Sequence, residues 1–215
     1  MAFITRNQCL AVGQQRCEPC SGAKDACRIL QDRGFISGQP KNGGRFDPVT
    51  QTTFAVALWA CVDAGLPIGG PKRRIGIVGT GLQGSLEANR AFFADYVNAG
   101  RNSARSNLFV YTLPTTPLAE AALFCGFTGP LWYMCQPVGG WGRMIEEAAR
   151  CAAETDIEAM LLVGADANEA VCLVMQKNAD KELFSVSYLK KHLQGVNAPG
   201  DVVRILGVAP GMKGS

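Results

Sequence analysis

The sequence has 215 residues, of which 47% are apolar and 18% charged, and its formal net charge is +3. These values exclude an intrinsically disordered chain, which combines high charge with few apolar residues, and the length predicts a single domain over residues 1–215. No uncharged apolar run reaches the ~18 residues of a transmembrane helix. Residues 1–13 also lack the pattern of a signal peptide, so we expect no membrane span and a cytoplasmic location.

Neither the net charge nor the number of cysteines identifies a binding partner for this chain. The one dense basic cluster, residues 72–74, precedes a predicted strand. A solvated loop explains it, as would a contact with nucleic acid or an acidic carrier, and we expect no nucleic-acid partner. The nine cysteines are an odd number and several lie in apolar segments. In a reducing compartment we expect them to be buried thiols and not a disulfide framework.

Hydrophobic periodicity predicts alternating strands and helices along the chain. Strands are expected at 2–12, 74–78, 131–135, 159–163, 170–175 and 202–208, and helices at 52–64, 87–99, 118–124 and 142–155. In the helix at 87–99 the side chains expected inside are Phe92, Phe93, Tyr96 and Val97. In the helix at 142–155, Met144, Ile145, Ala148 and Ala152 are expected to face inward, and Glu146, Glu147 and Arg150 to face water. The class is therefore α/β with a largely parallel sheet.

Residues 79–84 read Gly-Thr-Gly-Leu-Gln-Gly and stand between a predicted strand and a predicted helix. Gly79, Gly81 and Gly84 thus match a dinucleotide-binding fingerprint, in which a pyrophosphate approaches glycine backbone at a helix N-terminus. The fingerprint also needs an acidic residue about 20 positions later, at a strand end, and none is found there. Glycines that a tight strand-to-helix turn requires would account for the same motif. Nucleotide binding is therefore an alternative, and no cofactor is expected.

Four stretches in fixed order carry a resemblance to a known family. They are Ile4-Thr5 leading to Gly13, residues 74–81 (Arg-Ile-Gly-Ile-Val-Gly-Thr-Gly), residues 112–130 and residues 162–166 (Leu-Val-Gly-Ala-Asp). The third is the most specific, with a Leu-Pro-x-Thr-Pro turn, an Ala-rich helix and Gly-x-x-Gly-Pro. Together they resemble the N-terminal half of a β-ketoacyl synthase over about residues 2–175. The resemblance implies a thiolase-like layered fold with a mostly parallel sheet, as one half and not the full two-half enzyme.

Two departures from the family pattern concern catalysis. In ketosynthases the nucleophilic Cys lies eight residues after the Pro of Gly-Pro, and counting from Pro130 places Val138 there. An isopropyl side chain cannot attack a thioester. Cys135 lies three residues earlier, and we interpret it as a small buried thiol or, alternatively, as a displaced nucleophile. Condensation also needs a His pair or a His and an Asn, whereas the sole histidine, His192, lies in a basic stretch that reads as surface.

Loss of the Cys with retention of the fold is typical of chain-length factors, catalytically silent subunits of fatty-acid, polyene or polyketide assembly. The resemblance therefore implies pairing with a ketosynthase partner or with a second copy, with an acyl carrier protein as a possible further partner. The family dimerises through the strand after Gly-Pro, here residues 131–136, where Trp132, Tyr133 and Met134 suit an interface core or an internal strand equally. Trp141, in the elbow at residues 139–142, would plug an acyl channel or belong to the core. The alternative function is an acyl-transferring or thioester-processing enzyme using Cys135.

The N-terminal cysteines form a possible metal site. Cys9, Cys17, Cys20 and Cys27 include one Cys-x-x-Cys pair. Four thiolates can hold zinc or an iron–sulfur cluster, but a second Cys-x-x-Cys pair is absent. Cys9 falls in the first predicted strand and Cys27 in a helical segment, so reduced structural thiols are the alternative.

Overall fold

The computed structural model describes residues 22–81, 83–101, 105–135, 139–176 and 185–206, together with the backbone of 2–5 and 8–11. Its strands form one six-stranded sheet of order β2-β1-β6-β5-β3-β4. The strands are β1 (Ala2–Thr5), β2 (Gln8–Ala11), β3 (Ile75–Gly81), β4 (Leu131–Cys135), β5 (Ala159–Ala165) and β6 (Glu169–Gln176). Because β3 is parallel to β4 and β5 while β6 is antiparallel to both β5 and β1, strands β1, β3, β4 and β5 all run the same way. The expected layered α/β fold is confirmed, and four of the six strands share one direction. By its pairings the sheet is mixed, since three of the five strand pairs are antiparallel.

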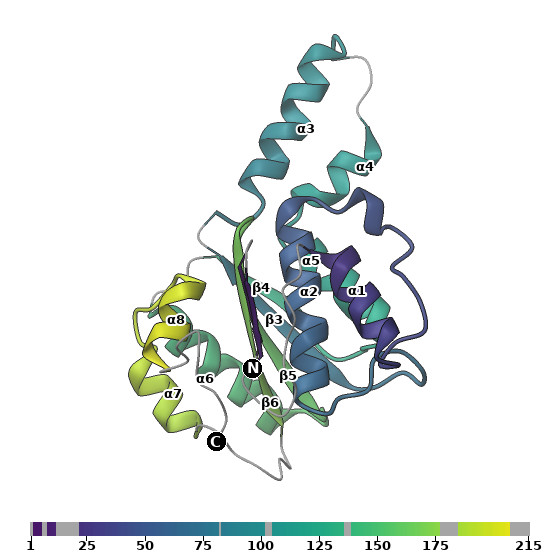
Figure 1. Cartoon of the computed structure of the whole chain (residues 1–215). Helices are drawn as coiled ribbons and strands as arrows, with labels where there is room; N and C mark the ends of the chain where they lie inside the picture. Colours follow the sequence, from purple (N-terminus) through teal and green to yellow (C-terminus); the bar gives the residue numbers. More distant parts are fainter. Residues whose placement is uncertain are drawn as a thin grey trace.

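Helices cover both faces of this sheet (Figure 1). On one face lie α1 (Ala23–Asp32), α2 (Pro48–Asp63) and α5 (Thr116–Cys125), and on the other α6 (Gly140–Glu154), α7 (Val186–His192) and α8 (Pro199–Ile205). Each face has its own cluster of buried side chains, since alternate residues of β3 and β5 point to opposite sides. Ile77 joins the cluster under α2, whereas its neighbour Val78 joins the cluster under α6.

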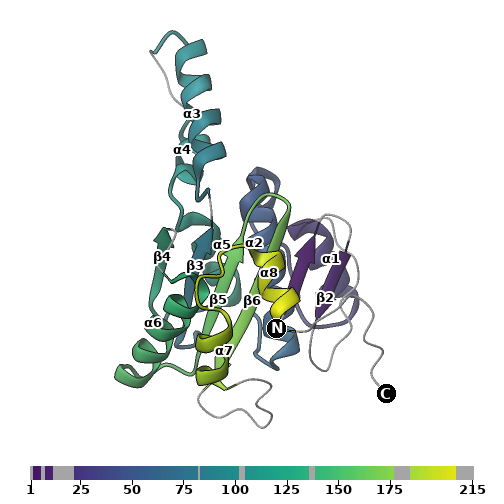
Figure 2. The ribbon, with the colours of Figure 1, turned by 90° about the vertical axis from the view of Figure 1, so that its left-hand side faces the viewer.

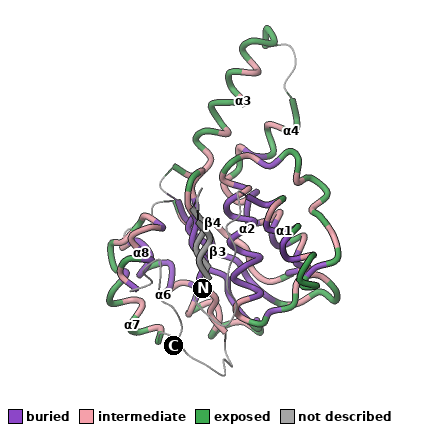
Figure 3. Tube along the Cα trace, viewed as in Figure 1, coloured by how far each residue is buried: buried purple, intermediate pink, exposed green. Residues whose placement is uncertain are grey.

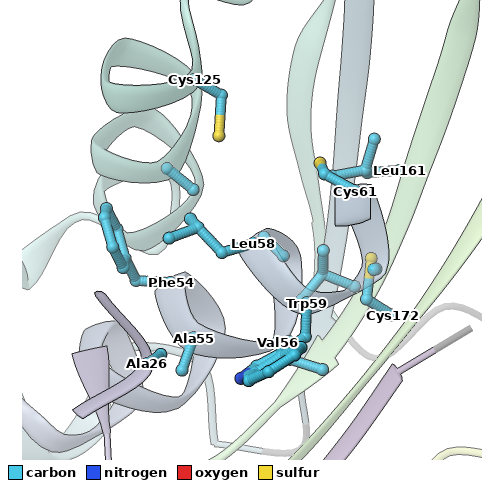
Figure 4. Packing of buried hydrophobic residues seen from close by; sticks show 14 of the residues in the cluster. Ala26, Phe54, Ala55, Val56, Leu58, Trp59, Cys61, Cys125, Leu161 and Cys172 are labelled. Carbon is cyan, nitrogen blue, oxygen red and sulfur yellow. The ribbon is translucent and has the colours of Figure 1, made fainter. Parts of the chain in front are cut away.

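Helix α2 is the centre of the first layer. Asp47 caps it by accepting a 2.9 Å hydrogen bond from the Thr50 N–H, and Pro48 suits its first turn because proline has no N–H to satisfy there. The residues from Phe54 to Cys61 are all fully buried. A helix that is apolar on every side needs cover on every side, and α1, α5 and the sheet provide it (Figure 4).

A different arrangement holds for the segment between β3 and α5. It comprises α3 (Leu86–Asn98), α4 (Ser106–Phe109) and the 3-10 turn η2 (Val110–Thr112), and it projects beyond the end of the sheet (Figure 2). We call residues 86–101 and 105–113 the arm. None of the α3 residues is buried, and Figure 3 shows α3 as mainly exposed. The expectation that Phe93 and Val97 lie inside is therefore wrong: α3 has an amphipathic pattern, but among its described residues only Ala88, in the first turn, packs against the α2 cluster.

Two further expectations are corrected. The single strand at 2–12 is instead two antiparallel strands, β1 and β2. The strand at 202–208 is instead α8, which begins at Pro199 and buries Val202 and Val203 against the second cluster. A short apolar run looks the same in a buried strand and a buried helix, so periodicity alone does not separate them.

Within the described residues, no single helix has the length and apolar composition to cross a bilayer. Only the pair formed by Ser106–Thr112 and Thr116–Cys125 reaches that length and composition, and it does so across a 99° bend.

Candidate functional site

The elbow connects the edge strand β4 to helix α6. Residues 136–138 lie outside the described residues, and with them Val138, the predicted nucleophile position. The chain then passes through Gly139 and Gly140, with φ of +92° and +60°. Only glycine adopts such angles without strain, so this pair permits the sharp entry into α6 that the sequence predicts at residues 139–142.

The first turn of α6 is hydrogen-bonded to the connection between α7 and α8, residues 193–196, which we call the cap loop. Trp141 N–H donates to Val196 O at 2.8 Å, and Gly142 N–H donates to Leu193 O at 3.0 Å. In return, Gly195 N–H donates to Gly139 O at 2.8 Å. The free N–H groups of a helix N-terminus normally attract anions. Here the cap loop uses two of them.

Gly140 and Gly142 let the cap loop approach this closely. A Cβ on Gly140 would lie 2.1 Å from Val196 O, and a Cβ on Gly142 would lie 3.0 Å from Lys190 O. The side chain of Gln194 lies over the same turn, since its Oε1 would be 2.6 Å from a Cβ on Gly142. Backbone and side chain of the cap loop therefore fill the space in front of the helix.

Trp141 is a core residue. It is fully buried in the cluster beneath α6 with Val78, Leu162 and Val202. Its indole lies on Gly164 of β5, where a Cβ would come within 2.4 Å of the ring. Trp141 therefore fixes α6 onto the sheet, and the alternative of a channel plug stays a prediction.

The strand β4 stands at the end of the sheet order and pairs only with β3 among the described strands. Trp132, Tyr133 and Met134 are half-buried. Tyr133 packs toward the α2 cluster, and Trp132 and Met134 toward the α6 cluster. The half-burial of all three distinguishes β4 from β5, which is buried throughout.

Cys135 ends β4, and its side chain is exposed and not buried as the first interpretation held. The physical reason is its position, since the last residue of an edge strand has a neighbour on one side only. His192 is exposed as expected: its Nδ1 lies 2.8 Å from Tyr188 O and its ring stacks on Tyr188 at 4.0 Å. No hydrogen bond joins Cys135 to His192. The structure therefore shows no nucleophile–base pair between them.

A narrow crevice lies where β3, β4 and β5 end, and its free interior of about 10 Å³ has room for roughly one water molecule. Its polar lining includes Asp47, Thr80, Ser85, Tyr111 and Tyr133. Several of these groups are already bonded: Thr80 Oγ1 donates to Met134 O at 2.9 Å and Ser85 Oγ to Thr112 O at 2.6 Å. No cysteine or histidine is among its described lining residues.

The two tyrosines of the crevice are held neutral. Burial, with a smaller effect of the nearby Cys135, raises the pKa of Tyr133 to about 12. Burial together with the charges of Glu120 and Asp47 raises the pKa of Tyr111 to about 12. Sequence reasoning did not single out Tyr111 or Thr80, because only the fold brings residues so distant in sequence to one end of the sheet.

The glycines of the possible dinucleotide fingerprint have packing roles. A Cβ on Gly79 would lie 2.7 Å from the Leu118 side chain, and a Cβ on Gly81 would lie 2.7 Å from Ala165 O. Protein atoms thus occupy the space beside both glycines, where a pyrophosphate would have to approach. Gly84 has φ of +53° and α3, which follows it, belongs to the projecting arm. The packing explanation therefore accounts for the motif.

The possible metal site is described only at Cys27. Cys17 and Cys20, like the side chain of Cys9, lie outside the described residues. Cys27 is fully buried in α1, and burial raises its pKa to about 11, which disfavours the thiolate that a metal needs. Elsewhere in the described part of the chain, no group of three or more His, Cys, Asp or Glu residues is placed to hold a metal ion.

Comparison with known proteins completes this picture. No family model and no curated protein sequence matches the chain. Among solved structures, a chain of the complex of the ketosynthase ApeO with its chain length factor ApeC from Xenorhabdus doucetiae matches over 81% of this chain and 74% of that chain, with a TM-score of 0.52 and 12% identity. The chain has a ketosynthase-like fold. At 12% identity this match establishes the fold and nothing further. The two chains are of similar length, since most of each is covered.

The ishigamide ketosynthase/chain length factor is also similar, with a TM-score of 0.48 and 17% identity over 62% of this chain. The chain spans about a third of the length of that protein, at 34% coverage.

Proposed function

We propose that this chain is a non-catalytic ketosynthase-like subunit of fatty-acid, polyene or polyketide assembly, which pairs with an active condensing enzyme. It would act as one domain over residues 1–215 in the cytoplasm, and an acyl carrier protein would bring substrate to its partner. The observation that carries this proposal is the occupied start of α6. There Trp141 N–H and Gly142 N–H are bonded to the cap loop.

Two features at one place argue against a condensing reaction by this chain. Counting along the sequence puts Val138, without a nucleophilic atom, at the family's cysteine position. Backbone N–H groups at the helix start, which would favour a thiolate or an oxyanion, donate to Val196 and Leu193.

The helix α6 also presents an ion-paired face of Arg143, Glu146 and Arg150 to solvent. A polar face of this kind suits a free surface.

The edge strand β4 supports the pairing. Ile77 N–H donates to Pro130 O. In a parallel pair, successive residues of a strand turn their N–H and C=O groups alternately toward the partner and away from it. Since Pro130 faces β3, the N–H and C=O groups of Tyr133 point away from β3. Among the described strands none pairs with this edge of β4. An edge strand with half-buried Trp132 and Met134 is a natural place for a partner strand. A ketosynthase-type subunit would extend the sheet there.

The proposal that the chain is non-catalytic is tested by measuring the mass of the intact protein after incubation with acyl-CoA and with acyl-loaded carrier protein. We expect no adduct on the parent chain and none on Val138→Cys, because the N–H groups that would activate the new thiol are in use. Cys135→Ser serves as the control. Stoichiometric acylation of Val138→Cys would overturn the non-catalytic proposal.

The exposed thiol of Cys135 favours a second candidate, thioester processing through a displaced nucleophile. The same experiment separates the two, since this candidate requires an acyl adduct on the parent that is lost in Cys135→Ser. It also requires His192→Ala to abolish turnover, because His192 is the sole histidine.

Pairing is tested by co-expression with a ketosynthase from the same organism. Tyr133→Pro removes one outward N–H of β4, whereas the matched control Tyr133→Phe keeps it. We expect the complex to survive Tyr133→Phe and to be lost in Tyr133→Pro, with circular dichroism showing that both variants fold. A complex that Tyr133→Pro leaves intact would exclude β4 as the interface.

A further inference from the structure

Side chains join the two parts of the arm, which are α3 on one side and α4 with η2 on the other. At its base, Thr112 O accepts hydrogen bonds from Ser85 Oγ at 2.6 Å and from Asn89 Nδ2 at 3.1 Å. Farther out, the rings of Phe92 and Phe109 pack with their centroids 5.5 Å apart. Among the described residues, no backbone hydrogen bond crosses from α3 to α4 or η2. The two parts are therefore held together by contacts that side chains make.

The outermost of these contacts is an ion pair between Asp95 and Arg105. On α3 the three contacts start from Asn89, Phe92 and Asp95. Residues three apart on a helix are neighbours on its surface, so the three contacts lie along one side of α3. Their partners follow in reverse order along the second part of the arm. The arm is thus a helical hairpin held together by one polar, one aromatic and one ionic contact.

The contacts between the arm and the rest of the protein lie at its base. Ala88 packs against the α2 cluster. Tyr111 is the one buried residue among the described residues of the arm, and its ring centroid lies 6.4 Å from that of Phe46. Val110 O accepts a 2.6 Å hydrogen bond from Thr116 Oγ1. The aromatic pair and the ion pair farther out belong to neither buried cluster.

Helix α3 has little to stabilise it apart from these contacts. It has 13 residues, none of them buried, and an isolated helix of about that length is marginal in water. Its N-cap Ser85 makes no side-chain capping hydrogen bond, and its last turn carries no basic residue to interact with the helix dipole. The ion pair of Arg90 with Glu87 within the helix is exposed and adds little. The helical form of α3 therefore depends on its contacts with α4 and η2.

We propose that the outer arm, which we define as residues 90–101 and 105–109, opens and re-forms as a unit while the sheet and its covering helices stay folded. Segments with few buried apolar contacts and exposed backbone hydrogen bonds open at a lower free energy than the whole domain. Opening of the outer arm breaks the Phe92–Phe109 and Asp95–Arg105 contacts but no contact within either buried cluster. The fold thus contains a projecting element that changes shape independently of the body, and this inference does not rest on the function proposed above.

Hydrogen exchange of the full chain, measured by mass spectrometry at urea concentrations below the unfolding transition, tests this inference. We expect the amides of α3 from Arg90 onward to exchange at least about a hundredfold faster than those of β3 and β5, yet more slowly than in an unstructured peptide. Their rates should depend little on urea, because opening of a small segment exposes little surface. The rates in β3 and β5 should rise steeply with urea, since those strands open only when the whole domain unfolds.

Two variants in the second part of the arm test whether the side-chain contacts hold α3. Phe109→Ala removes the aromatic contact without changing α3 itself, and we expect the α3 amides to exchange at least about fivefold faster, the effect of losing an aromatic pair. Val110→Ala is the matched control, since Val110 is also exposed but its side chain takes no part in the three contacts. It should leave the α3 rates unchanged. In both variants β3 and β5 should exchange as in the parent, because neither side chain belongs to a buried cluster.

Three results would overturn the inference. The first is an α3 whose amides share the protection and urea dependence of β3 and β5, because the arm would then open only with the whole domain. The second is an α3 without any protection, which would mean that no helix forms there. The third is an equal change of the α3 rates in Phe109→Ala and Val110→Ala, or no change in either. Acylation and complex formation are separate measurements, so failure of this inference and failure of the proposed function are distinguishable.

Discussion

The backbone N–H of Trp141 donates a 2.8 Å hydrogen bond to the carbonyl oxygen of Val196. The first turn of α6, which follows the position where the resemblance to ketosynthases predicts a nucleophile, is thus hydrogen-bonded to a loop of the same chain. Gly140 allows this contact, because a Cβ at that position would lie 2.1 Å from Val196 O. The contact is part of the folded structure, and its contribution to stability can be measured.

We expect Gly140→Ala to destabilise the protein by about 3 kcal/mol or more, combining the cost of a positive φ with a collision against the Val196 backbone. Gly195→Ala is the control, since Gly195 has φ of +75° but no heavy atom within 4 Å of its Cβ position. The Gly195→Ala substitution should lower the free energy of unfolding by only about 1 kcal/mol, because alanine bears the cost of the positive φ but meets no other atom. Urea unfolding measures both, and equal losses would show that the cap loop moves aside.

Trp141 and Gly164 should be energetically coupled. Gly164→Ala pushes a methyl group into the indole, and Trp141→Phe leaves a cavity, so each single change should cost about 1–4 kcal/mol. In the double variant the methyl group partly fills the space that the smaller ring leaves. The double-mutant cycle should therefore give a coupling of about 1 kcal/mol or more, whereas simple additivity would mean that the two residues do not share this space.

Thiol labelling should distinguish Cys135 from the buried cysteines. Under native conditions we expect Cys135 to react first among the six described cysteines with a disulfide reagent, because it alone of these six is exposed. Burial raises the pKa of Cys27 and Cys172, and the pKa of Cys61 is raised by its contact with Cys125 and by burial, so these thiols should react only on unfolding. Peptide mapping checks the order, with Cys135→Ser as the control, and early labelling of Cys61 would contradict it.

Alkaline pH should destabilise the fold through Tyr133. Its pKa is raised to about 12 in the folded state and is near 10 when unfolded. The neutral ring therefore contributes stability that is complete below pH 10 and declines as the pH rises from about 10 to about 12, by roughly 1–2 kcal/mol. Unfolding experiments at pH 8 and 11 measure this loss, and Tyr133→Phe should show a smaller one. An equal loss in both would assign the effect to other groups.

The sequence alone was enough to predict the fold class and most of its elements. The strands β3 to β6 and the helices α2, α3, α5 and α6 form close to their expected ranges, because each carries a strong local apolar pattern. The resemblance on residues 74–81 and 112–130 also predicted the ketosynthase-like layered fold. The position of Val138 is a matter of counting along the sequence and required no structure.

Only the tertiary structure decided which apolar helix faces are covered by other parts of the chain. The apolar residues of α3 and of α6 look alike in sequence, yet Ile145 is buried and Phe93 is exposed. A sheet lies beneath α6, whereas no described residue covers the outer face of α3. The cap loop could not be foreseen either, because Leu193 and Val196 reach the elbow through backbone groups that every residue shares. Periodicity records what one segment can bury, whereas packing between distant segments determines what it does bury.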